Sequence, residues 1–369
     1  MRVFCWIATL WGNTKNKPSA MYFQHSSTRR QFASSAACAA VAIAMPALQA
    51  QVKPEKTRIT ISVDGKASFA YLPLTIADQL GFFRDEGLDV QINDYLEAAS
   101  ATQGLLTGAA DVCSGSFERT LNLQAKNQVV TAFVLQGITP QIAFGVSTRS
   151  ASTNTTVSDL RGKKIGVPSL DSVASLMTQL LLLKAGLNIQ DVNLIATGSS
   201  SAALGAIRSG QIDALCGADP VMTMLEQKGD VKIISDARSL RGASQLFGGS
   251  MPSACLYATG EFVLKNPNTC QALAYAIVHS LKWLQTAGPS DIIKAVPDSY
   301  LLGDRALYLA SFNKIRQCIS LDGVLPDDGP LTAFRALSRF DSGLQQAKVD
   351  VKKTFTNVFA SRAKERFRV

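Results

Sequence analysis

Short apolar segments alternate with amphipathic helical segments along most of the chain, and this alternation constrains the fold more than any other feature. Ile59, Ile61 and Val63 have the period of a strand, whereas apolar residues between positions 173 and 181 recur at helical spacing. Regular alternation of this kind predicts an α/β fold with mostly parallel sheets and flanking helices. The predicted strands cover residues 59–63, 90–92, 110–113, 129–134, 142–146, 164–167, 192–195, 214–216, 231–234 and 254–258.

Two polar stretches divide this alternation into lobes. Residues 151–158 are rich in Ser, Thr and Asn without an apolar period, and residues 242–253 are rich in Gly and Ser. Such stretches are typical of linkers or hinges. We therefore expect two lobes: residues 51–150 begin the first lobe, residues 151–248 form the second, and residues 249–369 return to the first lobe with one strand and the C-terminal helices.

The first fifty residues, 1–50, predict export. Arg29 and Arg30 precede a mildly apolar stretch, and Ala50 ends a plausible cleavage site. The adjacent arginines resemble a twin-arginine signal, but a Sec signal that contains two arginines by chance fits the same residues. Either Met1 or Met21 fits as the first residue of the translated protein. No later stretch approaches the roughly 18 apolar residues of a membrane helix. We expect a periplasmic protein.

The charge of the remaining chain argues against a nucleic-acid partner. Five of the 37 Lys and Arg residues, and none of the 28 Asp and Glu residues, lie in residues 1–50. The remainder has a surplus of four bases, whereas a nucleic-acid binder needs a dense basic stripe.

Catalytic and metal-binding patterns are missing from the sequence after residue 50. It has one histidine, His279, and five scattered cysteines without a CxxC pair, which excludes the usual zinc and redox motifs. It also has no GxGxxG or GxxxxGK[ST] phosphate loop. Cys113 ends a predicted strand beside a Gly-Ser turn, so it is either buried or lines a pocket. We expect no catalytic residue, no metal and no cofactor.

Polar turns that join a strand to a helix supply the candidate binding residues. In open parallel sheets the carboxyl ends of the strands and the N-termini of the following helices form the ligand crevice. A serine there is also a common N-cap, and Asp219 before Pro220 fits a cap as well. Such turns in both lobes are what a clamp around a small molecule needs. The candidate ligand-binding residues are Ser68, Phe69, Ser100, Gly115, Ser116, Phe117, Ser169, Asp171, Ser172, Gly198, Asp219 and Ser250.

Three spaced motifs occur in order: GFFRDEGLDV at residues 81–90, DLRGKKIGVP at 159–168 and IRSGQIDA at 207–214. In these motifs the chain resembles the solute-binding proteins of ABC importers, in the nitrate, sulfonate, taurine and thiamine-pyrimidine-precursor group. The resemblance covers nearly the whole chain after residue 50. It implies a two-lobed, type II periplasmic binding protein fold that closes on a small organic solute and delivers it to a permease and its ATPase. We expect a monomer.

Departures from that group favour a particular kind of solute. Relatives often carry a Gly-Ser-Ser/Thr run where this chain has Leu170, Asp171 and Ser172, and a carboxylate there would repel a sulfonate or nitrate if it faced the pocket. Apart from Lys66, the crevice turns contain no base. The departures favour a neutral or amine-bearing organic solute with an aromatic or heterocyclic part.

An enzyme on the same fold stays open as the alternative. The resemblance extends to a desulfinase group with a cysteine nucleophile and to pyrimidine synthases that consume a histidine. Against both, the first crevice turn has Ser68 and Phe69 and no cysteine, and His279 lies in a late helix.

Overall fold

Each of the ten predicted strands overlaps a strand of the structure, a computed structural model that describes residues 53–150, 155–198 and 200–369. The predicted export signal lies outside these residues, as does part of the stretch 151–158. The strands are β1 (Arg58–Asp64), β2 (Asp89–Tyr95), β3 (Val112–Ser116), β4 (Val130–Leu135), β5 (Ile142–Ser147), β6 (Lys164–Val167), β7 (Asn193–Ala196), β8 (Ala214–Ala218), β9 (Val231–Asp236) and β10 (Ala254–Thr259).

Helices connect and cover these strands. The α-helices are α1 (Leu72–Gln79), α2 (Phe82–Asp85), α3 (Ala98–Leu106), α4 (Glu118–Ala125), α5 (Val173–Lys184), α6 (Ser200–Ser209), α7 (Val221–Gln227), α8 (Leu240–Phe247), α9 (Gly260–Lys265), α10 (Pro267–Thr286), α11 (Pro289–Ala295), α12 (Arg305–Ile315), α13 (Gly329–Leu337), α14 (Ser342–Gln346) and α15 (Val358–Phe367). A 3-10 helix, η1 (Phe69–Tyr71), precedes α1. The C-terminal helices predicted within residues 249–369 are therefore present.

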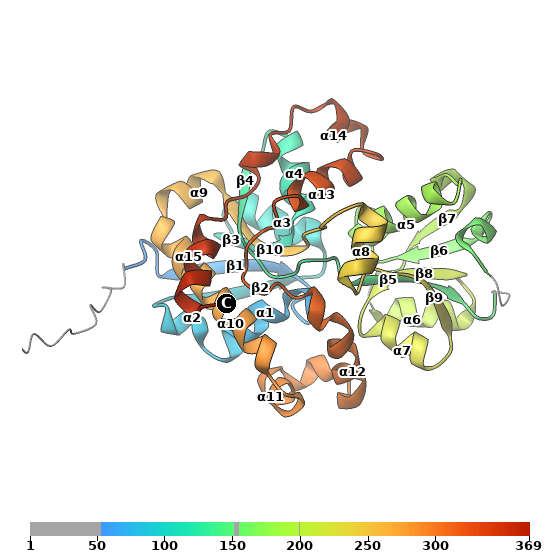
Figure 1. Ribbon diagram of the computed structural model, residues 1–369, viewed down its shortest axis with the longest axis horizontal. Helices are drawn as coiled ribbons and strands as arrows, with labels where there is room; N and C mark the ends of the chain where they lie inside the picture. Colours follow the sequence, from blue (N-terminus) through green and yellow to red (C-terminus); the bar gives the residue numbers. More distant parts are fainter. Residues whose placement is uncertain (1–52, 151–154, 199) are drawn as a thin grey trace, which may run out of the picture. The chain divides into compact units, whose positions relative to one another are not determined.

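The strands form two five-stranded sheets (Figure 1). The first has the order β2-β1-β3-β10-β4, with β1 parallel to β2 and β3, and β10 antiparallel to β3 and β4. The second has the order β7-β6-β8-β5-β9, with β6 parallel to β7 and β8, and β5 antiparallel to β8 and β9. In each sheet three parallel strands end at one edge. We call each sheet with its packed helices a lobe.

The chain crosses between the sheets twice. It leaves the first sheet between β4 and β5, at residues 136–141, and returns between β9 and β10. The boundary predicted at residue 150 is wrong, because β5 pairs with β8 and β9 in the second sheet. A strand buried on both faces is a continuous apolar run in either sheet, so the sequence did not reveal which sheet β5 joins. Helix α8 fills half of the Gly- and Ser-rich stretch that was predicted as the return hinge.

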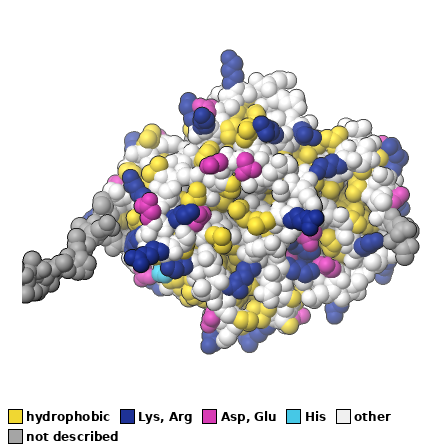
Figure 2. Space-filling view, in the orientation of Figure 1, with side chains coloured by type: hydrophobic (Ala, Val, Ile, Leu, Met, Phe, Trp, Pro, Cys, Tyr) yellow, Lys and Arg dark blue, Asp and Glu magenta, His cyan; other side chains and the backbone are white. Residues whose placement is uncertain are grey.

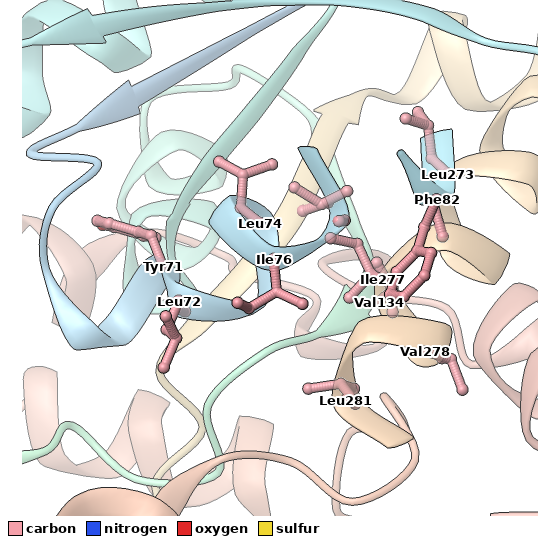
Figure 3. Close-up of a cluster of buried hydrophobic side chains, with 14 of the residues drawn as sticks. Tyr71, Leu72, Leu74, Ile76, Phe82, Val134, Leu273, Ile277, Val278 and Leu281 are labelled. Carbon is pink, nitrogen blue, oxygen red and sulfur yellow. The ribbon is translucent and has the colours of Figure 1, made fainter. Parts of the chain in front are cut away.

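The first lobe is held by apolar side chains from segments that are far apart in the sequence. Leu74 and Ile76 of α1 pack with Ile277 of α10 in one buried cluster. Figure 3 shows these side chains gathered with Val134 of β4. Phe312 of α12 belongs to the same cluster. Full burial of a side chain of this size stabilises the fold by about 1.5–3 kcal/mol.

The second lobe has an apolar layer on each face of its sheet. On one face, Ile207 of α6 and Met222 of α7 pack with Leu215 of β8. On the other face, Met177 of α5 belongs to a cluster that continues through the first crossing to Phe117 of the first lobe. The two lobes therefore share a continuous core on one side of their sheets.

We predict opposite effects for two helical glycine-to-alanine changes. A Cβ on Gly242 in α8 would lie 1.8 Å from the backbone oxygen of Asp236, whereas nothing lies within 4 Å of the Cβ position of Gly205 in α6. Gly205→Ala should raise the free energy of unfolding by up to about 1 kcal/mol, and Gly242→Ala should lower it by about 1–3 kcal/mol. Urea denaturation measures both. Equal stabilities would show that α8 can shift away from Asp236 at little cost.

Candidate functional site

An ion pair joins the two lobes at the carboxyl ends of their strands. Arg119, in the first turn of α4, donates from Nη2 to Oδ2 of Asp171 at 3.0 Å. Asp171 lies in the turn between β6 and α5, where the hydroxyl of Ser169 donates to its Oδ1 at 2.7 Å. Partial burial opposes the charge of Asp171, but the bonds from Ser169 and Arg119 outweigh it and lower the pKa of Asp171. We call the place where these side chains meet the interlobe junction.

Two more carboxyl groups of the first lobe belong to the same junction. Asp64 is the last residue of β1 and accepts a hydrogen bond from the hydroxyl of Tyr71 at 2.7 Å. Glu118 begins α4 and is 4% exposed, and no described group donates to its Oε2. Burial raises the pKa of both carboxyl groups, and the positive charge of Arg119 acts against that rise.

Asp64, Glu118 and Arg119 were not among the residues predicted from the sequence. The only base in the predicted turns is Lys66, which the structure pairs with Asp78 within the first lobe at 2.7 Å. Arg119 lies just beyond such a turn. A cation in the first turn of a helix opposes the helix dipole, and a local conflict of this kind is expected at functional sites. That conflict is the signal that could have identified Arg119.

Five of the predicted binding residues lie at or beside the interlobe junction: Ser116, Phe117, Ser169, Asp171 and Ser172. The hydroxyl of Ser116 bonds to Glu118. Ser172 caps α5 by accepting a bond from the backbone of Ser175 at 3.3 Å, and Phe117 is fully buried in the core. Phe117 is thus a core residue and not a wall of the crevice.

Gly115 is also close to the junction, but its role is steric. Gly115 and Ser116 belong to β3 and do not form the predicted turn. A Cβ on Gly115 would lie 2.9 Å from the hydroxyl of Tyr257, so a glycine is needed for Tyr257 to pack there.

The other predicted residues have separate surroundings. Ser68 caps η1 through the backbone of Ala70, and Phe69 packs on Tyr308 with ring centroids 4.6 Å apart. The backbone of Ser250 donates to Asp328 at 2.9 Å. Ser100 and Gly198 are exposed. Within the described part of the chain, the side chain of Arg119 bonds to Asp171 and not to Ser100, Gly198 or Ser250.

Asp219 belongs to a buried ionic network in the second lobe and not to the interlobe junction. Arg238 contacts Asp219 at 3.2 Å and Asp236 at 2.8 Å, and it also contacts Glu226. The side chains of Arg238 and Asp219 are 1% and 0% exposed. Burial raises the pKa of Asp219 and Arg238 opposes that rise. The carboxylate of Asp219 also accepts a bond from the backbone of Thr223 in α7 at 2.7 Å, but the N-cap residue of α7 is Pro220 and not Asp219 as predicted.

The cysteine thiols of the described residues are buried, whereas the ring of His279 is half-buried. Cys113 is 1% exposed and burial raises its pKa to about 11, so its thiol is protonated at neutral pH. The other four cysteines that the structure describes are also buried and free. The ring of His279 stacks between Phe82 and Phe367, at centroid distances of 3.8 and 4.9 Å, and burial lowers its pKa.

The surface and composition of the described residues add three observations. Lys and Arg side chains are spread over the face in Figure 2 and interleaved with Asp and Glu. In residues 53–150, 155–198 and 200–369, no group of three or more His, Cys, Asp or Glu side chains could hold a metal ion. No helix in these ranges is both long and apolar enough to cross a membrane.

We predict that Arg238 stabilises the second lobe by neutralising Asp219. Arg238→Leu leaves Asp219 buried without a cation, and such a change costs about 3–5 kcal/mol. The double variant Arg238→Leu, Asp219→Leu should recover much of that loss, because it buries no unpaired charge. Chemical denaturation measures both. A double variant that is no more stable than Arg238→Leu would contradict the pairing.

The fold and the polar strand ends that meet between two lobes define a class, the two-lobed periplasmic binding proteins. The family described as NMT1/THI5 like matches residues 68–289, which is more than half of the chain. The chain belongs to this family, and the resemblance found in its sequence motifs is confirmed.

Solved structures confirm the type II periplasmic binding protein fold. A protein from Bordetella bronchiseptica RB50 is 48% identical with a TM-score of 0.80, over 86% of this chain and 100% of that one. The alkanesulfonate-binding protein SsuA from Xanthomonas axonopodis pv. citri, solved with MOPS, is 17% identical with a TM-score of 0.64, over 82% of this chain and 99% of that one. At that identity, the likeness to SsuA shows the fold alone.

The curated relatives include a binding protein and an enzyme. YtlA of Bacillus subtilis, provisionally named a binding protein, is 23% identical over 269 residues, 72% of this chain and 77% of the relative. A 4-amino-5-hydroxymethyl-2-methylpyrimidine phosphate synthase of Schizosaccharomyces pombe is 26% identical over 226 residues, 60% of this chain and 63% of the relative.

Proposed function

We propose that this protein captures a small organic solute between its two lobes in the periplasm and delivers it to the permease and ATPase of an ABC importer. The observation that carries this proposal is the interlobe junction. Arg119 and Asp171 come from different lobes, and each follows the carboxyl end of a parallel strand, which is where open α/β sheets bind ligands.

Two chain crossings between the sheets fit a clamp. A hinge in such a protein consists of a few connecting residues that absorb the motion, and residues 136–141 connect the sheets in this way. A solute that bonds to both lobes stabilises the closed form relative to the open form, because it loses half of its contacts on opening. Selectivity then depends on groups from both lobes, such as Asp64 and Asp171.

Membership of the family supports the remaining parts of the proposal. The predicted export signal at residues 1–50 and the binding-protein relatives agree with a periplasmic location. The protein acts as a monomer, with one solute per chain, and the permease recognises its closed form.

A thermal-unfolding screen against a library of organic solutes and small anions tests the proposal. A ligand at about 100 times its dissociation constant adds roughly 2.7 kcal/mol to the stability of the folded protein, which raises the melting temperature by several degrees. We expect one chemical class to produce a saturable shift, and the compound to be recovered unchanged. If no class produces a saturable shift, the binding function is contradicted.

A pair of arginine variants tests whether the solute binds at the interlobe junction. Arg119→Gln removes the interlobe ion pair and should weaken solute binding about tenfold or more, since a hydrogen bond to a charged group contributes about 1.5–3 kcal/mol. Arg161→Gln is the matched control, because Arg161 pairs with Asp191 within the second lobe and is 63% exposed. Similar affinity of the two variants would place the solute away from the interlobe junction.

The second candidate function is an enzyme on the same fold, and the pyrimidine synthase relative is the observation that favours it. A cysteine nucleophile would need a thiolate, whereas the thiol of Cys113 is buried and its pKa is raised to about 11. We therefore expect Cys113→Ser to leave the affinity for the solute unchanged, and we expect no conversion of the solute by either protein. If the solute is recovered chemically converted, and Cys113→Ser stops the conversion, the protein is an enzyme and the proposed binding function is wrong.

A further inference from the structure

The interlobe junction contains more acid than base. Asp64, Glu118 and Asp171 all interact electrostatically with a single base, Arg119. Lys66 does not correct this balance, because it pairs with Asp78 at 2.7 Å. With every carboxyl group ionised, the junction therefore has an excess of negative charge.

The carboxyl groups of the junction differ in how well they are satisfied. Asp171 is neutralised by Arg119 and also accepts a bond from Ser169. Asp64 accepts a bond from the neutral hydroxyl of Tyr71, and Oε2 of Glu118 has no donor among the described residues. Neither Asp64 nor Glu118 forms an ion pair with a described residue. Two carboxyl groups are thus left without a cation of their own.

A buried carboxylate without a cation lowers the stability of the folded protein, and apolar residues at these positions would make the protein more stable. The second lobe shows how this chain treats a buried acid that serves the fold, because Asp219 has Arg238 beside it. The junction has no such partner for Glu118, which is 4% exposed. The missing positive charge is what a bound solute can supply.

On the basis of the proposed solute-binding function, we propose that the solute carries a cationic nitrogen, as in a protonated amine, and that Asp64 and Glu118 bind it. Arg119 of the first lobe stays paired with Asp171 of the second lobe, and this ion pair closes the site. An inorganic anion or a simple sulfonate would face two carboxyl groups and a base that is already neutralised, so the same residues exclude anions.

Isothermal titration of the purified protein with a panel of known charges tests this proposal. The cations are putrescine, spermidine and choline, and the anions are nitrate and ethanesulfonate. We expect saturable binding of at least one cation and none of either anion. Asp64→Asn keeps an oxygen for the hydroxyl of Tyr71 but loses the charge, and it should weaken cation binding about 10- to 100-fold.

Two further variants keep the result interpretable. Glu118→Gln should weaken cation binding as well. If Asp64→Asn does not fold, Glu118→Gln still tests whether the carboxyl groups bind the cation. Asp89→Asn is the matched control, because Asp89 lies at the start of β2 and is 78% exposed, and it should bind like the unchanged protein. Circular dichroism confirms that each variant is folded.

The outcomes separate this proposal from the binding function. Binding of an anion alone, or cation binding that neither Asp64→Asn nor Glu118→Gln weakens, overturns the charge assignment and leaves the binding function in place. No binding of any cation also overturns the charge assignment, while the broader solute screen decides the binding function independently.

Discussion

The structure depends on the burial of both faces of two sheets. Strands such as β5, in which every residue is buried, contain no charged side chain. Polar and charged side chains therefore gather where strands end, and parallel pairing brings the ends of β1 and β3 together. The interlobe junction follows from this constraint, because Asp64 ends β1 and Arg119 follows β3 by three residues.

Two ionic clusters show how the chain uses buried charge. The network around Arg238 joins it to Asp219, Asp236 and Glu226, and Lys314 of α12 also contacts Glu226. That network is complete and links α7 to a helix whose apolar side chains belong to the core of the first lobe. The interlobe junction is incomplete, and this difference separates a cluster that holds the fold from one that is suited to a ligand.

The shared core would keep the two lobes in contact during the closing motion that the proposed function requires. One apolar cluster runs from the first lobe through Leu135 and Ile142, on either side of the first crossing, into the second lobe. Hydrophobic contact is not directional, so a small rotation about residues 136–141 changes these contacts little. The directional contacts, such as the bond between Arg119 and Asp171, are the ones that select one arrangement of the lobes.

The sequence alone determined the ten strands, the two-lobed α/β class and the family, because strand period, turn residues and local motifs are properties of neighbouring residues. The tertiary structure decided which sheet β5 joins and which polar residues meet. Asp219 satisfied every local criterion for a binding residue, yet Arg238, 19 positions later, holds it in a buried ion pair. Asp64, Arg119 and Asp171 are far apart in the sequence, and only the packing of two lobes brings their charges within reach of one another.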